Sequence, residues 1–179
     1  MKNCNYVAGQ WVAGEGYIKN INPSDTNDII DEYSNATSQQ LNDAVESAQL
    51  AQKKWEQVGI EKRANILHNI GSELIKQSKE IGTLLSREEG KTLPEGIGEV
   101  VRSGQQFQYY AASALRQFGE NIASTRDGVS VEMTREPVGV CGIISPWNFP
   151  IAIAAWKSAP AIAFGNAIVL KPASQTPAS

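Results

Sequence analysis

The feature that most constrains the fold is a pair of short apolar runs, at residues 138–144 and 167–170, with one turn and one helical stretch between them. Continuous apolar runs are typical of strands that are covered on both faces, as in parallel sheets. Residues 145–150 form the expected tight turn, and the helical stretch ends at Phe164-Gly165. Strand, helix and strand within about thirty residues form one βαβ unit. The sequence therefore predicts an α/β fold with a buried parallel sheet.

Helical segments fill the region before this unit, from about residue 37 to residue 118. Thr37 and Gln40, and again Thr92 and Glu95, have the spacing of a capping box, which marks the start of a helix. Inward-facing residues then recur at helical spacing. They are Leu41, Val45, Ala48, Ala51 (or Gln52) and Trp55 in the first segment, Ala64, Leu67, Gly71 and Leu74 in the second, Ile81, Leu84 and Leu85 in the third, and Ile97, Val100, Gly104, Phe107, Ala111, Ala114 and Phe118 in the fourth. We expect an α layer over the sheet.

Short extended pieces are expected on either side of the helices. Residues 6–8 and 11–13 flank a turn at Gly9-Gln10 and predict a small hairpin. Residues 21–25 have turn chemistry, and residues 29–33 form another brief strand. Residues 129–135 alternate apolar and polar side chains, which indicates a half-exposed strand.

Charge and composition exclude several function classes. The 179 residues have a net charge of −3, and Lys and Arg are scattered, so we expect neither nucleic-acid binding nor a polybasic membrane anchor. The longest apolar stretch, 151–164, is interrupted by Lys157, Ser158 and Pro160 and is too short to span a bilayer. The first residues contain no apolar run of the signal-peptide kind. We expect a cytoplasmic protein.

The cysteines and the single histidine do not indicate a metal or redox site. Cys4 and Cys141 lie far apart and have neither the spacing of a disulfide framework nor that of metal ligands. Cys141 falls within an apolar run, where a thiol is expected to be buried and inert. His68 lies on a predicted helix without an acidic or nucleophilic partner, so we expect a surface or packing role.

Candidate ligand-binding residues follow the two predicted strands, because ligands of open α/β sheets bind outside the carboxyl ends of the strands. Asn148 lies between Pro146 and Pro150 after the first strand, and Lys171 and Ser174 follow the second. A neutral amide donor near a lysine suits polarisation of a carbonyl beside an anionic cofactor. Spacing alone leaves other roles open, since an Asn before a helix is often its cap and a Lys at a strand end is often a solvated charge.

Motifs in the same region carry a family resemblance. In order along the chain they are Glu136-Pro137-Val138-Gly139-Val140, Ile144-Ser145-Pro146-Trp147-Asn148-Phe149-Pro150, Trp156-Lys157, Ala159-Pro160-Ala161, Gly165-Asn166 and Leu170-Lys171-Pro172-Ala173-Ser174-Gln175-Thr176-Pro177. In residues, order and spacing they closely resemble the aldehyde dehydrogenase superfamily. Upstream, Asn22-Pro23, residues 48–55 and residues 88–93 are also similar to the N-terminal region of that family. The resemblance covers essentially the whole chain.

The resemblance implies a fold and a division of the chain. Residues 1–118 would form the N-terminal strands and helices of the cofactor domain, and residues 119–136 an oligomerisation strand segment. Residues 137–179 would begin the Rossmann-like NAD(P)-binding unit, which is truncated here. The chain would then be the N-terminal part of an aldehyde dehydrogenase that forms a homo-oligomer when complete.

The resemblance also implies roles for single residues. Asn148 matches the catalytic donor to the oxyanion that forms when a cysteine thiolate attacks the aldehyde. Lys171 matches the lysine that holds the adenosine ribose of the cofactor. The remaining positions fall into two groups: Ile144, Ser145, Pro146 and Trp147 match residues that line the cofactor cleft, and Phe149 and Trp156 match residues beside the substrate channel, although aromatic side chains there could equally belong to the core.

Ser174 bears on the choice of cofactor. Many NAD-preferring relatives have a Glu at this position, whose carboxylate accepts hydrogen bonds from the ribose hydroxyls and would repel a 2′-phosphate. A serine leaves Lys171 free to pair with that phosphate, so we expect NADP to be accepted, alongside NAD. The other interpretation is that Ser174 caps the next helix.

The resemblance implies the reaction and indicates a substrate class. Thiolate attack on an aldehyde, hydride transfer to NAD(P)⁺ and hydrolysis of the thioester would be expected. Residues 108–111 and 144–156 look like the α-ketoglutarate semialdehyde dehydrogenase group, whereas succinate semialdehyde dehydrogenases commonly have an Arg in place of Trp156. The nucleophilic Cys and general-base Glu are expected in later sequence, so this chain would be inactive by itself. The alternative is a natural short chain that acts as a non-catalytic assembly or nucleotide-binding module.

Overall fold

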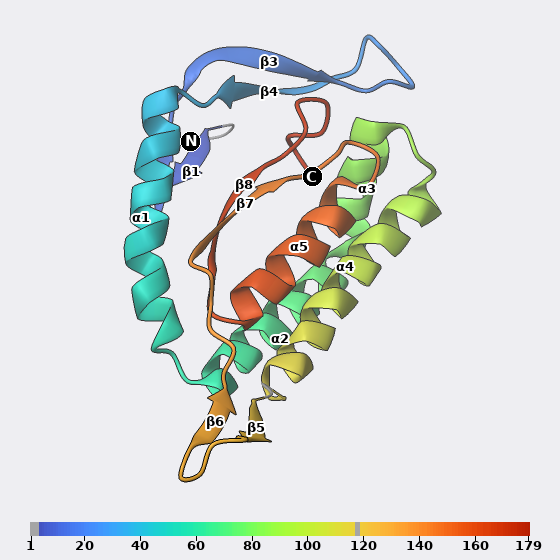
Figure 1. Cartoon of the computed structure of the whole chain (residues 1–179). Coiled ribbons are helices and arrows are strands. Elements are labelled where there is room, and N and C mark those ends of the chain that lie inside the picture. Colours follow the sequence, from blue (N-terminus) through green and yellow to red (C-terminus); the bar gives the residue numbers. More distant parts are fainter. Residues whose placement is uncertain (1–3, 117–118) are drawn as a thin grey trace.

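A computed structural model describes residues 4–116 and 119–179. The elements follow in the order β1 (Asn5–Val7), β2 (Gln10–Val12), β3 (Glu15–Ile21), β4 (Ile29–Asn35), α1 (Ser38–Glu56), α2 (Ile60–Lys76), α3 (Ser78–Glu89), α4 (Leu93–Ala114), β5 (Glu120–Ala123), β6 (Ser130–Met133), β7 (Val140–Ile144), α5 (Pro150–Ala163) and β8 (Ala167–Lys171). Helices α2, α3 and α5 all pack against α4, and α1 and α5 lie on opposite sides of the β7–β8 pair (Figure 1). The predicted α layer beside a parallel sheet is confirmed.

The βαβ unit is present as predicted. Strands β7 and β8 are parallel, with a register that runs from Val140 opposite Ala167 to Ile144 opposite Lys171, and α5 connects them. The prediction that both strand faces are buried is wrong for this chain. Ile144 is 70% exposed, and Cys141 is half-buried rather than buried, because the sheet has only these two strands among the described residues. Val138 lies outside the strand and is exposed.

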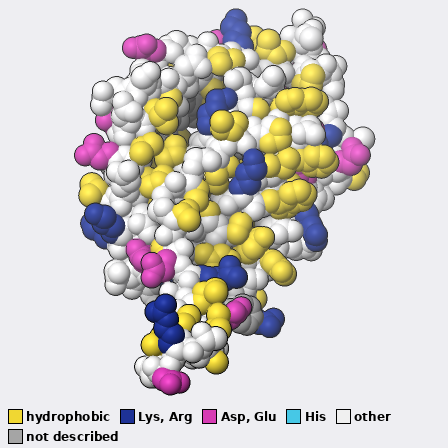
Figure 2. Space-filling view, viewed as in Figure 1, with side chains coloured by type: hydrophobic (Ala, Val, Ile, Leu, Met, Phe, Trp, Pro, Cys, Tyr) yellow, Lys and Arg dark blue, Asp and Glu magenta, His cyan; other side chains and the backbone are white. Residues whose placement is uncertain are grey.

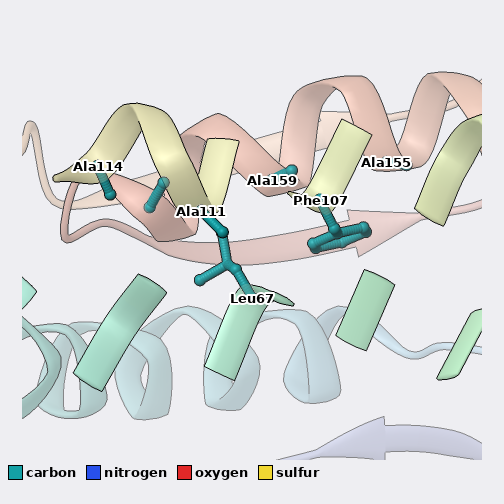
Figure 3. Packing of buried hydrophobic residues seen from close by; sticks show 7 residues of the cluster. Leu67, Phe107, Ala111, Ala114, Ala155 and Ala159 are labelled. Atoms are coloured by element: carbon teal, nitrogen blue, oxygen red, sulfur yellow. The ribbon is translucent and has the colours of Figure 1, made fainter. Parts of the chain in front are cut away.

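The core lies between α2, α4 and α5. Figure 3 shows Leu67 of α2 facing Phe107, Ala111 and Ala114 of α4, with the alanines of α5 behind them. Small residues on α5, including Ala155, Ala159 and Ala163, allow this helix to approach α4 closely. These positions follow the apolar periodicity of the sequence, since a helix buries the side chains that recur at its own period.

Both predicted capping boxes are confirmed, at Thr37–Gln40 and at Thr92–Glu95. On α1 the inward face is only partly as predicted. Leu41 is exposed, and Gln52 rather than Ala51 is buried, because its Nε2 donates to the carbonyl oxygen of Gly165. Phe118, predicted on the inner face of the fourth helix, lies outside the described residues.

The N-terminal strands form two antiparallel hairpins, β1–β2 and β3–β4. The first hairpin was predicted, but its turn is at Ala8-Gly9, where both residues have positive φ, and not at Gly9-Gln10. Strand β3 was not predicted. Its Glu, Gly, Lys and Asn residues obscure the alternation, and the strand is recognisable only from its pairing with β4.

The β5–β6 hairpin projects from the helical layer at the bottom of Figure 1. Every residue of both strands is exposed. The predicted half-exposure of residues 129–135 is therefore wrong, because no other described element covers either face of this hairpin.

On the face shown in Figure 2, lysines and arginines are separate from one another and lie between apolar and acidic side chains. Among residues 4–116 and 119–179, no helix has the length and apolar character needed to cross a membrane, and no His, Cys, Asp and Glu side chains cluster as a metal site would require.

Candidate functional site

The carboxyl ends of β7 and β8 lie side by side, which is where the sequence placed the candidate site. Ile144 pairs with Lys171, and the backbone N–H of Ser145 continues the ladder by donating to the carbonyl oxygen of Lys171 at 3.2 Å. The Nζ of Lys157 on α5 donates to the carbonyl oxygen of Ile144 at 3.0 Å. The turn that contains Asn148 therefore starts from a fixed point beside Lys171.

Asn148 is exposed and lies directly before Phe149, the N-cap residue of α5. It is therefore not the N-cap of this helix, which removes the structural role that an Asn in this context often has. Its backbone carbonyl oxygen accepts a hydrogen bond from Lys91 Nζ at 3.3 Å. The backbone at Asn148 is thus anchored while its carboxamide remains at the surface.

The other predicted positions of this loop differ in burial. Ser145 is buried, Pro146 is half-buried, and Trp147 is exposed. Phe149 and Trp156 are both about half exposed, at 49% and 47%, so neither is a core residue in this chain.

Lys171 is the last residue of β8, Ser174 follows three residues later, and both are exposed. Lys171 Nζ donates to the carbonyl oxygen of Pro172 at 2.8 Å. Ser174 lies in a turn that is closed by a hydrogen bond from Thr176 N to the carbonyl oxygen of Ala173 at 3.2 Å. Residues 172–177 contain no carboxylate, and the exposed polar side chains at this edge are those of Lys171, Ser174 and Gln175. Such a donor set fits a ribose that carries a phosphate.

The segment after β8 is held by Glu88 of α3, which sequence reasoning did not identify. This carboxylate accepts hydrogen bonds from the backbone N–H groups of Ala178, at 2.7 Å, and Ser179, at 3.0 Å, and from Asn20 Nδ2 at 2.5 Å. Burial raises the pKa of Glu88 and outweighs these hydrogen bonds, which lower it. Glu88 therefore joins β3 and α3 to the segment that begins with Lys171.

The amino end of α5 depends on Glu99 of α4, a second residue that sequence reasoning missed. Glu99 Oε1 accepts from the backbone N–H groups of Ile151, at 3.1 Å, and Ala152, at 3.0 Å. The N-cap Phe149 has no side-chain acceptor and Pro150 has no N–H, so Glu99 supplies the acceptor that the first turn lacks. The one indication of this role in the sequence was that Glu99 lies beside Val100, one of the apolar positions that α4 buries.

Lys91 connects this carboxylate to the Asn148 loop. Its Nζ donates to Glu99 Oε2 at 2.5 Å, lies 2.8 Å from Glu89 Oε2, and lies 4.5 Å from the centre of the Phe149 ring. Burial lowers the pKa of Lys91, but hydrogen bonds and charge interactions with Glu89 and Glu99 more than compensate, and the net pKa is raised. The side chain therefore stays a cation at neutral pH.

A surface hollow on α2 and α3 contains none of the predicted site residues. Its lining is mostly apolar and comprises Ile66, Asn69, Ile70, Glu73, Leu74, Gln77 and Ile81. It offers no group positioned like Asn148 or Lys171, so the strand ends remain the better candidate for chemistry.

Residues 11–179 match the sequence profile of the aldehyde dehydrogenase family. The chain is 39% identical over 174 residues to the alpha-ketoglutaric semialdehyde dehydrogenase of Bacillus subtilis, and the match covers 96% of this chain and 36% of that protein. It is 38% identical to the alpha-ketoglutarate semialdehyde dehydrogenase of Haloferax volcanii, with 97% and 36% covered. The chain thus spans about a third of the length of these relatives.

Solved structures show the same arrangement of elements. An aldehyde dehydrogenase from Brucella melitensis biovar abortus 2308 superposes with a TM-score of 0.96 at 31% identity, covering 98% of this chain and 37% of that one. An NADP-dependent enzyme of E. coli gives 0.95 at 29% identity, with 98% and 37% covered. An NAD-dependent benzaldehyde dehydrogenase from Corynebacterium glutamicum gives 0.92 at 34% identity, with 98% and 38% covered.

Proposed function

The chain belongs to the aldehyde dehydrogenase family, and from this we propose that it supplies the oxyanion-stabilising and ribose-binding parts of an NAD(P)-dependent enzyme. That enzyme oxidises an aldehyde to a carboxylate through a cysteine thioester. The observation that supports the proposal best is the pairing of Ile144 with Lys171, because it brings the start of the Asn148 turn beside the cationic strand end.

Asn148 is proposed as the donor to the oxyanion. When a thiolate attacks the aldehyde carbon, a C–S bond forms and the carbonyl oxygen takes up negative charge. An amide N–H that is already in place stabilises that charge without reorganisation at the moment of reaction. The exposed carboxamide of Asn148 on an anchored backbone meets this requirement. We place the nucleophilic cysteine and the general-base glutamate in sequence beyond this chain.

Lys171 and Ser174 are proposed to hold the adenosine ribose of the cofactor, with Ile144, Ser145, Pro146 and Trp147 lining its cleft. The bound cofactor supplies the hydride acceptor of the reaction. The ammonium of Lys171 can pair with a 2′-phosphate, and no carboxylate in residues 172–177 opposes it. NADP is therefore proposed as an accepted cofactor alongside NAD.

The proposed substrate is a semialdehyde of the α-ketoglutarate kind. Two relatives of 38–39% identity have names that state this activity. Phe149 and Trp156 are proposed to line the substrate channel, and their half-exposed rings are consistent with that position.

The β5–β6 hairpin is proposed as an oligomerisation surface of the complete enzyme. Both strands are exposed along their whole length, and among the described residues each strand pairs only with the other. An unpaired strand edge offers free N–H and C=O groups to a strand of another subunit.

The test of the proposed function is Asn148→Ala in the complete enzyme that contains this chain. With α-ketoglutarate semialdehyde as substrate, kcat should fall by about 10²–10³-fold, the usual effect of removing one oxyanion donor. The KM for NADP should not change, because the ribose contacts are intact. Asn69→Ala, on the exposed face of α2, is the matched control and should leave kcat unchanged. An Asn148→Ala enzyme with wild-type kcat would contradict the proposal.

A further inference from the structure

We propose that Lys91 and Glu99 are positioning residues that hold the 145–150 loop, and with it the carboxamide of Asn148, in its working geometry. The inference rests on the proposed role of Asn148 and adds the residues through which that role is maintained. Both lie outside the βαβ unit: Lys91 lies directly before Thr92, the N-cap of α4, and Glu99 lies on α4.

Glu99 fixes the end of the loop where α5 begins. One carboxylate oxygen accepts from two successive backbone N–H groups of the first turn, those of Ile151 and Ala152. The side chain is only 2% exposed, so water does not compete for these contacts. A negative charge at this position also interacts favourably with the positive end of the helix dipole.

Lys91 fixes the loop itself. Its ammonium donates to the other oxygen of Glu99 and to the backbone carbonyl oxygen of Asn148, and it lies over the ring of Phe149. Three neighbouring groups, the Asn148 carbonyl, the Phe149 ring and the first turn of α5, are thus joined through one cation and one carboxylate. Loss of the cation would release Asn148 and Phe149 together.

The charges of the cluster make this arrangement rigid. Lys91 is 11% exposed and lies between two carboxylates, Glu89 and Glu99, at 2.8 Å and 2.5 Å. Removing one partner of a buried ion pair leaves the other charge uncompensated, which is strongly unfavourable. At a surface ion pair, rotation of an exposed side chain would be enough to release the loop. Here the nearly buried Lys91 side chain is held by two carboxylates, so the loop keeps its contacts with Lys91.

The test is a double-mutant cycle in the complete enzyme. Lys91→Met should lower kcat markedly, up to about 10²-fold, since a misplacement of about 1 Å at a reacting group can have that effect. The KM for NADP should stay the same. In the Asn148→Ala background the same substitution should change kcat little, because a residue that acts through Asn148 has no further effect once the carboxamide is absent. An equal fall in both backgrounds would overturn the proposal.

Two further variants keep the test decisive if Lys91→Met does not fold. Lys91→Arg retains a cation between the carboxylates and should recover part of kcat. Glu99→Gln keeps an oxygen acceptor but removes the charge that holds Lys91, and should lower kcat with KM unchanged. Arg87→Met is the control, because it removes an exposed ion pair four residues before Lys91 and should leave kcat at the wild-type value.

Hydrogen exchange separates a failure of this inference from a failure of the proposed function. In Glu99→Met, which removes the oxygen that accepts from both groups, the amide protons of Ile151 and Ala152 should exchange faster than in the wild-type protein, whether or not the enzyme oxidises aldehydes. Unchanged exchange at both amides would overturn the positioning role of Glu99. A wild-type enzyme that fails to oxidise any aldehyde would instead overturn the proposed function, and the exchange result would still decide whether Glu99 restrains the loop.

Discussion

Gly71 of α2 and Gly104 of α4 lie against each other where the two helices cross, and neither position has room for a methyl group. A Cβ atom on Gly71 would lie 2.5 Å from the carbonyl oxygen of Gly104, and a Cβ atom on Gly104 would lie 2.6 Å from that of Gly71. Both obstacles are backbone atoms, so relief requires movement of a whole helix. The glycine pair thus sets the distance between α2 and α4.

Gly104→Ala should therefore reduce the free energy of unfolding by about 1–3 kcal/mol, the usual effect of overpacking a close contact. Gly98→Ala, in the same helix, is the matched control because a Cβ atom there meets nothing within 4 Å. This control should stabilise the protein by roughly 0.5–1 kcal/mol, since alanine is the better helix former. Urea unfolding of the two variants checks the contrast, and equal effects would refute it.

Arg63 of α2 should be important for stability because it binds the carboxyl ends of two other helices. Its side chain is buried. At the carboxyl end of α1 it donates to the carbonyl oxygen of Glu56 at 3.2 Å and to that of Val58, two residues beyond the helix, at 2.6 Å. At the carboxyl end of α5 it donates to the carbonyl oxygen of Ala163 at 3.3 Å. Arg63→Met should lower the free energy of unfolding by about 2–4 kcal/mol, because several buried acceptors lose a charged donor. Arg102→Met, an exposed arginine of α4, should change stability little in the same assay.

Asp28 should make the folded state sensitive to acid. Hydrogen bonds from Arg87 and Asn22 lower its pKa from 3.8 to about 2. A carboxyl group whose pKa is lowered by folding adds stability at higher pH and loses that contribution as the pH falls from about 4 to about 2. The pKa values of Glu73 and Glu95 are lowered as well, so the wild-type protein must be compared with Asp28→Asn. Denaturation across this range should show a shallower pH dependence for the variant; parallel curves would count against the prediction.

Ser174→Glu should reverse the proposed cofactor tolerance. A carboxylate at this exposed position would accept hydrogen bonds from ribose hydroxyls and repel a 2′-phosphate beside Lys171. In the complete enzyme the variant should lose affinity for NADP more than for NAD. Ser174→Ala is the control, since it removes the hydroxyl without adding charge. Equal losses for the two cofactors after Ser174→Glu would rule out this explanation.

The sequence was most informative where one segment determines its own structure. Both capping boxes, the periodic faces of α2 and α4, and the alternation of strand, helix and strand around α5 depend on neighbouring residues, and all were predicted. Strand β3 was missed because its identity depends on pairing with β4 and not on its own composition.

For the candidate site, the sequence indicated the residues at the strand ends but not the residues that hold the loops. Asn148 follows β7 and Lys171 ends the adjacent strand β8, so topology predicts that both lie at the same edge of the sheet. Glu88, Lys91 and Glu99 act on those loops from α3, from the loop before α4 and from α4 itself, and no local pattern shows which backbone groups a charged side chain will meet 52 or 90 residues further along the chain. The burial of β7 was overestimated. An apolar run shows that a strand can be buried on both faces, but it does not show which other strands and helices are present to cover those faces.

Helix α5 has a carboxylate from α4 at its amino end and a guanidinium from α2 at its carboxyl end. Each charge opposes the partial charge of the helix terminus that it contacts, and each comes from a different part of the chain. The βαβ unit proposed to bind the nucleotide therefore depends on residues that lie outside it. If residues 138–171 were grafted onto another protein, the strands and the helix could form again. The two ends of α5 would then lack the charges of Glu99 and Arg63, and the Asn148 turn would lack its hydrogen bond from Lys91.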